Sequence, residues 1–275
     1  MKINKSELAI IIPVGNDCRI ENCLKSIENY ANNISVVLIN NSGEKSISNI
    51  ISRFKNKINL KVILSNSKNI GYLRNLGIRN SQAKAFYFID SDCIIKSDSI
   101  KEALNSISKN PAVRGYIKFE GASKLCKLDA ELRQKRYDSN PYFAYCPNLL
   151  IRKDLFDRVG LFDEKFRYGS DGEFAKRLVD LKVNVTYKPS IEIIHYGPKK
   201  DKKVISTWIS YGEGRWRRYK NSDIKEKLNG MFKPILLDSK KRLSFNLVAL
   251  SCLICRWYGW AKMAIKANFI NSKEI

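Results

Sequence analysis

The sequence predicts an α/β domain with a mostly parallel central sheet, helices on both faces of that sheet, and a basic helical extension at the C-terminal end. Over residues 8–90, short continuous apolar runs alternate with segments whose apolar residues recur at helical spacing. Parallel strands that are buried on both faces have this uninterrupted apolar character. Residues 201–275 are instead rich in basic and aromatic side chains.

The first half of the chain reads as β-α-β-α-β-α-β. Four apolar runs predict parallel strands, at Leu8–Val14, Ile34–Asn40, Leu60–Ser65 and residues 85–90. Helical spacing predicts the intervening helices, around residues 20–27, 47–54 and 72–81. A further helix follows in "SDSIKEALNSI", with Ser97 or Asp98 as its N-cap.

The pattern changes after residue 110, and residues 110–150 give the least interpretable signal. Beyond them we expect a strand at Asn148–Ile151 and a helix from Lys153. A helix over Asp171–Leu181 would place Phe174, Leu178 and Leu181 on one face. Two strands would follow, at Asn184–Tyr187 and Ile191–His195. We therefore divide the chain into a domain of residues 1–200 and an extension of residues 201–275.

Composition and charge narrow the function classes. The chain has 275 residues, 44% of them hydrophobic, which is enough to fill a core and argues against disorder. Fifty Lys and Arg against 27 Asp and Glu give a net charge of +23, which favours nucleic acid, anionic lipid headgroups or a phosphate-bearing substrate. Seven scattered cysteines and no signal-peptide pattern indicate a reducing cytoplasm. Cys252 and Cys255 lack a second pair, so packing is preferred over zinc.

Polar residues gather where the predicted parallel strands end. Ligands bind at that edge of an open α/β sheet. The residues are Asn16, Asn40, Asn41, Ser42, Asn66, Asn69, Asp90 and Asp92.

Asp90 and Asp92 form the most informative part of this set. With no Lys or Arg nearby in the sequence, the two carboxylates would repel each other unless a divalent metal carrying phosphate oxygens bound between them. The alternative is a solvated turn. His195, the only histidine, follows another strand and is a plausible third ligand, although a lone histidine is more often a structural hydrogen-bonding group.

An ordered set of motifs over about residues 7–200 resembles family 2 glycosyltransferases of the GT-A fold. The motifs are "IIIPVGN", "NNSG", "NIGYLRNLGI", "FYFIDSDCII", "CPNLLIRKDLFDRVGLFDEKF", "YGSDGEFAKRL" and "IEIIHYG". The resemblance implies an inverting, metal-dependent enzyme that uses a nucleotide sugar, most often a UDP-sugar. It further implies a glycan or lipid-linked acceptor in the synthesis of cell-surface polysaccharides.

Site residues follow from the resemblance position by position. Asp171 corresponds to the catalytic base, and Asp92 with His195 corresponds to the ligands of Mn²⁺ or Mg²⁺. The positions implied in nucleotide-sugar binding are Pro13, Val14, Asn16, Asn41, Ser42, Gly71, Arg74, Asn75, Asp90 and Ser91.

Three departures from the family pattern bear on this reading. Asn40 and Asn41 replace a base-recognising aspartate, Gly15 replaces an aromatic residue, and Ser170 replaces the glutamate before the base. An amide can still accept a hydrogen bond from uracil N–H and donate one to its carbonyl. Glu173 is an alternative base. A catalytically silent relative and a basic nucleic-acid-binding protein remain as alternative functions.

The C-terminal part carries a second set of signals. "WISYGEGRWRRYK" interleaves aromatic and arginine side chains. This pattern is typical of a segment that binds a membrane interface, a donor diphosphate, a lipid-linked phosphate or stacked bases. The alternative is a solvated amphipathic helix without a binding role. The apolar stretch 243–255 has 13 residues, too short for the roughly 20 that span a bilayer. We expect an interfacial helix with Trp257, Tyr258 and Trp260 at headgroup depth, or a helix packed on the core or in a homodimer. The expected location is the cytoplasmic face of the membrane.

Overall fold

The structure is a computed structural model that describes residues 2–28, 33–219 and 243–271. For residues 243–249 and 266–271 it describes the backbone only. It divides into two compact units, each built from three segments of chain. The first unit comprises residues 1–119, 137–165 and 170–196, and the second comprises residues 120–136, 166–169 and 197–275. The second unit thus joins two earlier segments to the predicted C-terminal extension.

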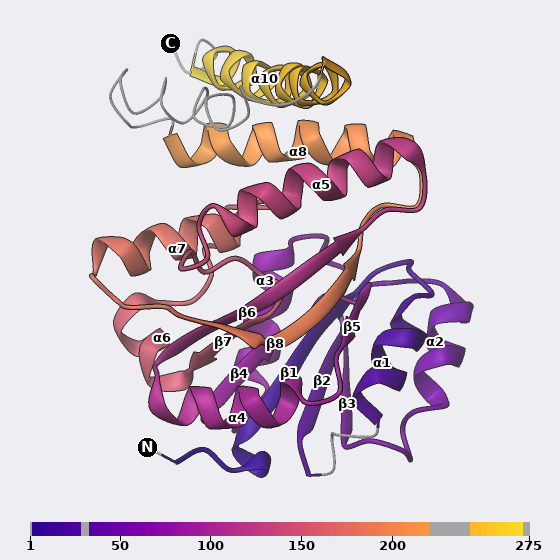
Figure 1. Ribbon diagram of the computed structural model, residues 1–275, viewed down its shortest axis with the longest axis vertical. Coiled ribbons are helices and arrows are strands. Elements are labelled where there is room, and N and C mark those ends of the chain that lie inside the picture. Colours follow the sequence, from indigo (N-terminus) through magenta and orange to yellow (C-terminus); the bar gives the residue numbers. More distant parts are fainter. Residues whose placement is uncertain (1, 29–32, 220–242, 272–275) are drawn as a thin grey trace. The chain divides into compact units, whose positions relative to one another are not determined.

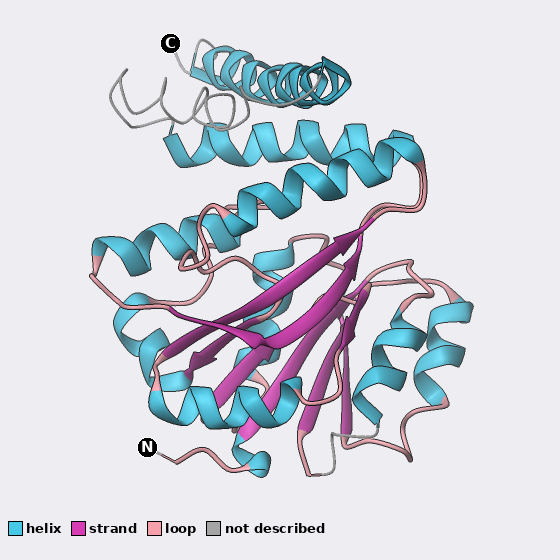
Figure 2. Cartoon of the chain, viewed as in Figure 1, coloured by secondary structure: helices cyan, strands magenta, loops and turns pink. Residues whose placement is uncertain are grey.

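Within the described residues, eight strands form one sheet with the order β3-β2-β1-β4-β7-β6-β8-β5 (Figures 1 and 2). Their bounds are β1 Leu8–Val14, β2 Ser35–Asn40, β3 Leu60–Leu64, β4 Ala85–Phe88, β5 Cys93–Ile95, β6 Ala112–Glu120, β7 Leu149–Arg152 and β8 Thr186–Tyr196. β1 pairs in parallel with β2 and β4, and β2 with β3. The pairs β4–β7, β6–β7 and β5–β8 are antiparallel. The sheet is therefore mixed, and the predicted parallel part is its β3-β2-β1-β4 half.

Two features of the sheet differ from the sequence prediction. β5 and β6 were not predicted, and the two strands expected at 184–187 and 191–195 form the single strand β8. Pro189 lies inside β8, is exposed, and precedes the residues Ile193–His195 that pair with β5. β8 does not pair with β5 at Pro189. The N–H group that proline lacks is therefore not needed for a hydrogen bond to β5.

Helices of the first unit cover both faces of the sheet, with α4 in front of the strands and α3 behind them in Figure 1. Alternate residues such as Ala9, Ile11 and Phe88 share one apolar core with residues of α3, α6 and α7. The bounds are α1 Ile20–Glu28, α2 Lys45–Ser52, α3 Ile70–Arg79, α4 Ser99–Lys109, α6 Lys153–Val159 and α7 Ser170–Asp180, preceded by the short helix Lys5–Glu7.

One detail of these helices was wrongly predicted, and another was predicted only in part. Leu181 is 48% exposed rather than buried beside Phe174 and Leu178, because α7 ends one residue earlier at Asp180. Asp98 occupies the N-cap position of α4, but its side chain makes no capping hydrogen bond.

The second unit contains most of α5 (Lys124–Asp138), together with α8 (Asp201–Tyr219) and α10 (Leu243–Asn271). Trp208 packs with Cys126, Val204 and Cys252, so Cys252 is a core residue as expected. The indole Nε1 of Trp208 donates to Asp129 Oδ1 at 2.6 Å. In the part of the chain that the structure describes, no helix is both long and apolar enough to cross a membrane.

Helix α8 also holds the short segment 166–169 of the same unit. A Cβ atom on Gly214 would lie 2.5 Å from the carbonyl oxygen of Tyr168, so only glycine allows this close approach. Arg218 Nη2 donates to the carbonyl oxygen of Gly169 at 3.0 Å. Gly169 has a φ of +78°, in the left-handed region that favours glycine. The next residues in the chain are Ser170 and Asp171.

Candidate active site

The ends of β1 and β2 form the first part of the site. The backbone N–H of Asn41 donates to the carbonyl oxygen of Val14 at 2.9 Å, which continues the pairing of the two strands. Asn41 Nδ2 donates to the carbonyl oxygen of Ser67 at 2.8 Å, so the orientation of the amide is fixed. Asn41 Oδ1 is buried and has no hydrogen-bond partner among the described residues. Because Gly15 lacks a side chain beside this oxygen, an acceptor is left for a ligand.

The start of α3 provides the second part. Arg74 is 4% exposed, and its Nη2 lies 3.0 Å from Asp90 Oδ1. Burial disfavours the charge of Arg74, but the acidic groups of Cys146, Asp90 and Asp171 outweigh burial and raise the pKa of Arg74 above its ordinary value. The Arg74 guanidinium therefore lies within electrostatic reach of both Asp90 and Asp171.

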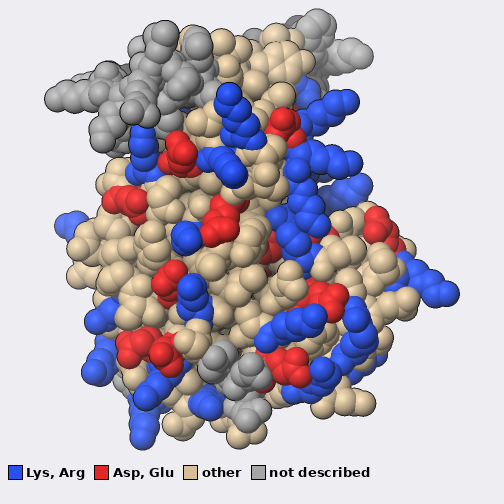
Figure 3. All heavy atoms as spheres, turned by 45° about the vertical axis from the view of Figure 1, so that its right-hand side comes forward, with Lys and Arg blue, Asp and Glu red and all other residues tan. Residues whose placement is uncertain are grey.

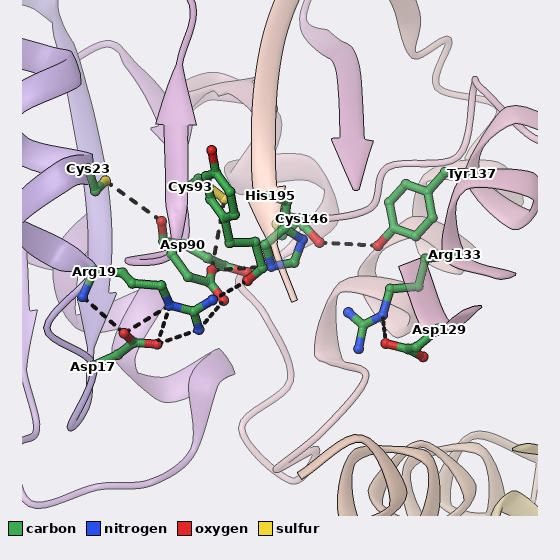
Figure 4. A network of polar contacts seen from close by, with 12 residues as sticks. Asp17, Arg19, Cys23, Asp90, Cys93, Asp129, Arg133, Tyr137, Cys146 and His195 are labelled. Carbon is green, nitrogen blue, oxygen red and sulfur yellow. Dashed lines mark hydrogen bonds and ion pairs between the residues drawn. The ribbon is translucent and has the colours of Figure 1, made fainter. Parts of the chain in front are cut away.

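Asp92 and His195 form the third part. Cys93 in β5 pairs directly with His195 in β8, which brings the neighbouring Asp92 to the histidine. His195 Nε2 lies 3.2 Å from Asp92 Oδ1, and Cys93 Sγ lies 4.0 Å from that oxygen (Figure 4). Burial raises the pKa of Asp92, but His195 and Arg19 outweigh burial and hold it below its ordinary value. Asp92 is therefore ionised at neutral pH.

Arg19, which sequence reasoning missed, completes this corner. Its guanidinium binds Asp17 at 2.5 Å, Asp92 at 3.3 Å and the carbonyl oxygen of Tyr196 at 2.7 Å (Figure 4). The expectation that Asp90 and Asp92 lack a nearby cation was therefore wrong, since Arg74 neutralises one acid and Arg19 the other. The two acids also have different partners, so they do not form one pair. An arginine in the loop after the first strand, near the same sheet edge, was the available signal.

Asp171 and Glu173 lie in the first turn of α7, and their environments differ. Asp171 is half-buried, and its Oδ1 accepts a hydrogen bond from the N–H of Gly172 at 2.8 Å. Both carboxylate oxygens of Glu173 bind Arg177, at 2.7 and 2.8 Å. Arg177 also donates to the carbonyl oxygens of Val159 and Leu161. Glu173 is thus committed to holding α7 on the preceding loop, and Asp171 keeps acceptor capacity for a substrate.

Gly71 packs the start of α3 against the start of α7. A Cβ atom on Gly71 would lie 3.1 Å from the Cβ of Ser170, which is fully buried. Ser170 Oγ has no hydrogen-bond partner among the described side chains and backbone groups. This contact fixes the residue before Asp171 against the helix that carries Arg74.

The remaining predicted residues are placed as follows. Pro13 and Val14 are buried at the end of β1, Asn16 is exposed, and Ser42 and Ser91 are half-buried. The amide of Asn75 is used within the protein, where it binds both backbone groups of Phe162 and the carboxylate of Glu164. Asn75 therefore orders the loop before α7 instead of offering a free hydrogen-bonding group.

Asp92 and His195 also fit a divalent metal. They supply one carboxylate and one imidazole with ligand atoms 3.2 Å apart, and Cys93 adds a sulfur within 4.8 Å. No described residue binds His195 Nδ1. An imidazole ligand favours Mn²⁺ over the harder Mg²⁺.

Solved structures share this architecture. The mannosyltransferase PcManGT from Pyrobaculum calidifontis, in complex with GDP-Man and Mn²⁺, aligns with a TM-score of 0.62 over 94% of this chain and 73% of that one, at 14% identity. TarS 1–349 of Staphylococcus aureus, in complex with UDP-GlcNAc, aligns with a TM-score of 0.58 over 91% and 81%, at 18% identity. The fold is therefore that of GT-A glycosyltransferases, as predicted.

Sequence comparison gives the family. The family described as "Glycosyl transferase family 2" matches residues 9–160, and the chain belongs to that family. Glycosyltransferase AglE of Haloferax volcanii is 24% identical over 193 residues, which cover 66% of this chain and 64% of AglE. The poly(ribitol-phosphate) beta-N-acetylglucosaminyltransferase TarS of S. aureus is 22% identical over 218 residues, 73% of this chain and 37% of TarS. This chain thus spans less than two thirds of either relative.

Proposed function

We propose that this protein is an inverting glycosyltransferase that transfers a sugar from a nucleoside diphosphate to a hydroxyl group of a glycan or lipid-linked acceptor. The observation that carries the proposal is the position of Arg74, which binds Asp90 and lies within electrostatic reach of Asp171. This position supports the proposal that the residues implied in donor binding and in proton removal act in one site. Family membership supports the same chemistry.

Uridine is the nucleoside that we propose, and one unpaired acceptor in the site supports this choice. Asn41 Oδ1 is the buried acceptor without a partner, and Nδ2 of the same amide is already used by Ser67. A base with an N–H donor at its edge, such as uracil, satisfies that oxygen. TarS is solved with UDP-GlcNAc, which agrees with this choice, whereas PcManGT is solved with GDP-Man.

In the proposed reaction, Asp171 accepts the proton of the acceptor hydroxyl as that oxygen attacks the anomeric carbon from the face opposite the diphosphate. Arg74 and Arg19 place positive charge beside the acids that face the donor. Asp92 and His195 would hold Mn²⁺ or Mg²⁺, which supplies Lewis-acid stabilisation for the leaving diphosphate when bound.

The acceptor we propose belongs to a cell-surface or lipid-linked glycan assembled at the cytoplasmic face of a membrane. The name of TarS describes transfer to poly(ribitol-phosphate), a polymer whose phosphates are anionic, and this chain has a net charge of +23. A nucleic-acid-binding function has less support, because it gives Asp90, Asp92 and His195 no role, whereas the family match supports sugar transfer.

Donor turnover tests the proposal. Purified protein is incubated with UDP-GlcNAc, UDP-Glc, UDP-Gal or GDP-Man and Mn²⁺, and release of nucleoside diphosphate is followed with and without EDTA. We expect one UDP-sugar to be hydrolysed slowly without acceptor, and Asp92→Ala to abolish this activity. Asp180→Ala, which removes an acid that is 57% exposed, is the matched control and should remain active. No turnover of any donor would favour the catalytically silent alternative, and full activity of Asp92→Ala would remove the metal site from the proposal.

A further inference from the structure

Helix α10 carries a stripe of exposed apolar side chains. Leu250, Ile254, Tyr258 and Ile265 are 50%, 54%, 61% and 58% exposed, respectively. Their spacing of four, four and seven residues places them on one face of the helix, together with exposed Ala261. We call these five residues the α10 stripe. Isolated exposed apolar residues are common, but a continuous stripe on one helix face indicates an interaction surface.

The opposite face of α10 is already used in packing. A Cβ atom on Gly212 of α8 would lie 1.9 Å from the carbonyl oxygen of Arg256, and one on Gly259 would lie 2.0 Å from that of Ile209. Cys252 and Leu253 are buried. The two helices thus meet closely through glycine on both sides, which fixes the rotation of α10 about its axis. The α10 stripe points away from this contact.

The unit that carries the stripe is strongly basic. Its three segments hold 24 basic and 9 acidic residues, a net charge of +15 out of the +23 of the whole chain. Arg215 shows how closely these charges lie. Its pKa is lowered to about 9, first by burial and then by the positive charges of Arg136, Arg256 and Arg218. Lys and Arg also outnumber Asp and Glu on the face drawn in Figure 3.

A pocket of about 210 Å³, lined by more basic than acidic side chains, adjoins the stripe within the same unit. Three basic side chains line it, Arg167, Arg217 and Lys262, together with one acidic side chain, Glu213, whose Oε1 lies 3.2 Å from Lys262 Nζ. Lys262 lies four residues after Tyr258 and three before Ile265, so its side chain is next to the stripe on the surface of α10. Apolar side chains and a basic pocket side by side match the two layers of a phospholipid surface.

We propose that the second unit docks on an anionic lipid bilayer, with the α10 stripe among the upper acyl chains and the basic pocket against headgroup phosphates. The stripe and the net charge of +15 carry this assignment, and it does not depend on the glycosyltransferase reaction. A second copy of the chain is the competing occupant, but pairing two units of this charge is opposed by repulsion, whereas anionic lipid is complementary. Tyr258 has the amphipathic side chain that membrane interfaces favour.

Vesicle binding tests the proposal with the full chain. Co-sedimentation is measured with vesicles of phosphatidylcholine alone and of equal parts phosphatidylcholine and phosphatidylglycerol. We expect binding only to the mixed vesicles, weakened by salt because the attraction is partly electrostatic. The affinity of the double variant Ile254→Asp, Tyr258→Asp for the mixed vesicles should be lower than that of wild type by about tenfold or more, because the variant loses two inserted side chains. Leu64→Asp, at a side chain of the first unit that is 76% exposed, is the matched control and should bind as wild type does.

Three results would overturn the proposal. The first is equal binding to both kinds of vesicle, and the second is unchanged binding by the double variant. The third is a wild-type chain that binds neither kind of vesicle but forms a dimer in analytical ultracentrifugation, when the double variant stays monomeric. A second copy of the chain would then be the occupant of the stripe. Melting temperatures of both variants are measured first, and an intact Tm in the double variant assigns any lost binding to the surface. If that variant does not fold, Tyr258→Ser alone is used, with the same expected direction.

Discussion

Asp171 and Glu173 are neighbouring acids of α7 for which the structure predicts opposite effects of substitution. Replacing Asp171 with asparagine keeps an oxygen that can accept from the N–H of Gly172, which Asp171 Oδ1 accepts at 2.8 Å. The variant therefore keeps the local hydrogen bond and removes only the negative charge and the ability to take a proton. Glu173→Gln, by contrast, breaks both ionic contacts with Arg177.

The expected magnitudes follow from these contacts. A positioned general base contributes about 10²- to 10⁴-fold to a rate, so Asp171→Asn should lower kcat by that factor, or about 3–5 kcal/mol of barrier. Its effect on the free energy of unfolding should be about 0.5 kcal/mol or less, because asparagine and aspartate serve equally well near a helix N-terminus. Glu173→Gln loses a half-buried ion pair worth about 1 kcal/mol, which lowers Tm by about 2–4 °C in a chain of this size.

The assay measures kcat and KM for nucleoside diphosphate release, UDP affinity by calorimetry and Tm for both variants. We expect Asp171→Asn to lose turnover with unchanged UDP affinity and Tm, and Glu173→Gln to lose Tm with nearly unchanged turnover. The reverse pattern would identify Glu173 as the base. Loss of UDP affinity together with kcat in Asp171→Asn would refute the reasoning, because Asp171 would then be a donor contact.

Three further predictions concern other parts of the molecule. The pKa of Asp92 is lowered from its ordinary value of 3.8 in the folded protein, so its stabilisation is complete above that value and is lost as pH falls through the lower folded pKa. Urea unfolding should therefore show wild type losing its stability difference from Asp92→Asn only as the pH falls below 3.8. Gly212→Ala should cost about 1–3 kcal/mol by forcing α8 from α10, measured by the same unfolding, whereas Gly43→Ala, which meets nothing within 4 Å, should cost little. Asn41→Ala should weaken UDP binding about tenfold by calorimetry, since one buried hydrogen bond is lost.

Local sequence patterns were sufficient for half of the sheet. β1, β2 and β4 are short apolar runs whose burial needs no partner to be recognised, β3 is a short apolar run at the sheet edge, and the parallel arrangement follows from the helices between them. β5 has three residues and exists because it pairs with Ile193–His195, about a hundred positions away. No local pattern in "CII" could have indicated that pairing. α5 mixes charged and apolar residues without a clear stripe, so its helical period was not recognised.

The candidate site shows the same division. Asp90, Asp92 and His195 were found because each follows an apolar strand. The cations that neutralise these acids were missed, since Arg19 reaches Asp92 across 73 positions and Tyr196 across 177. The repulsion between Asp90 and Asp92 is therefore weaker than their neighbours in the sequence indicate. The commitment of Glu173 to Arg177 was a local i, i+4 pair and could have been predicted.

The contact between α8 and the segment 166–169 limits how this protein can be shortened. A chain ended at residue 200, where the sequence alone places a domain boundary, would lose Gly214 and Arg218. Those residues hold Tyr168 and Gly169, and Asp171 is the second residue after Gly169. The C-terminal region is thus continuous in structure with the loop that delivers the proposed base. The smallest active fragment is expected to include α8, even if membrane docking is dispensable in solution.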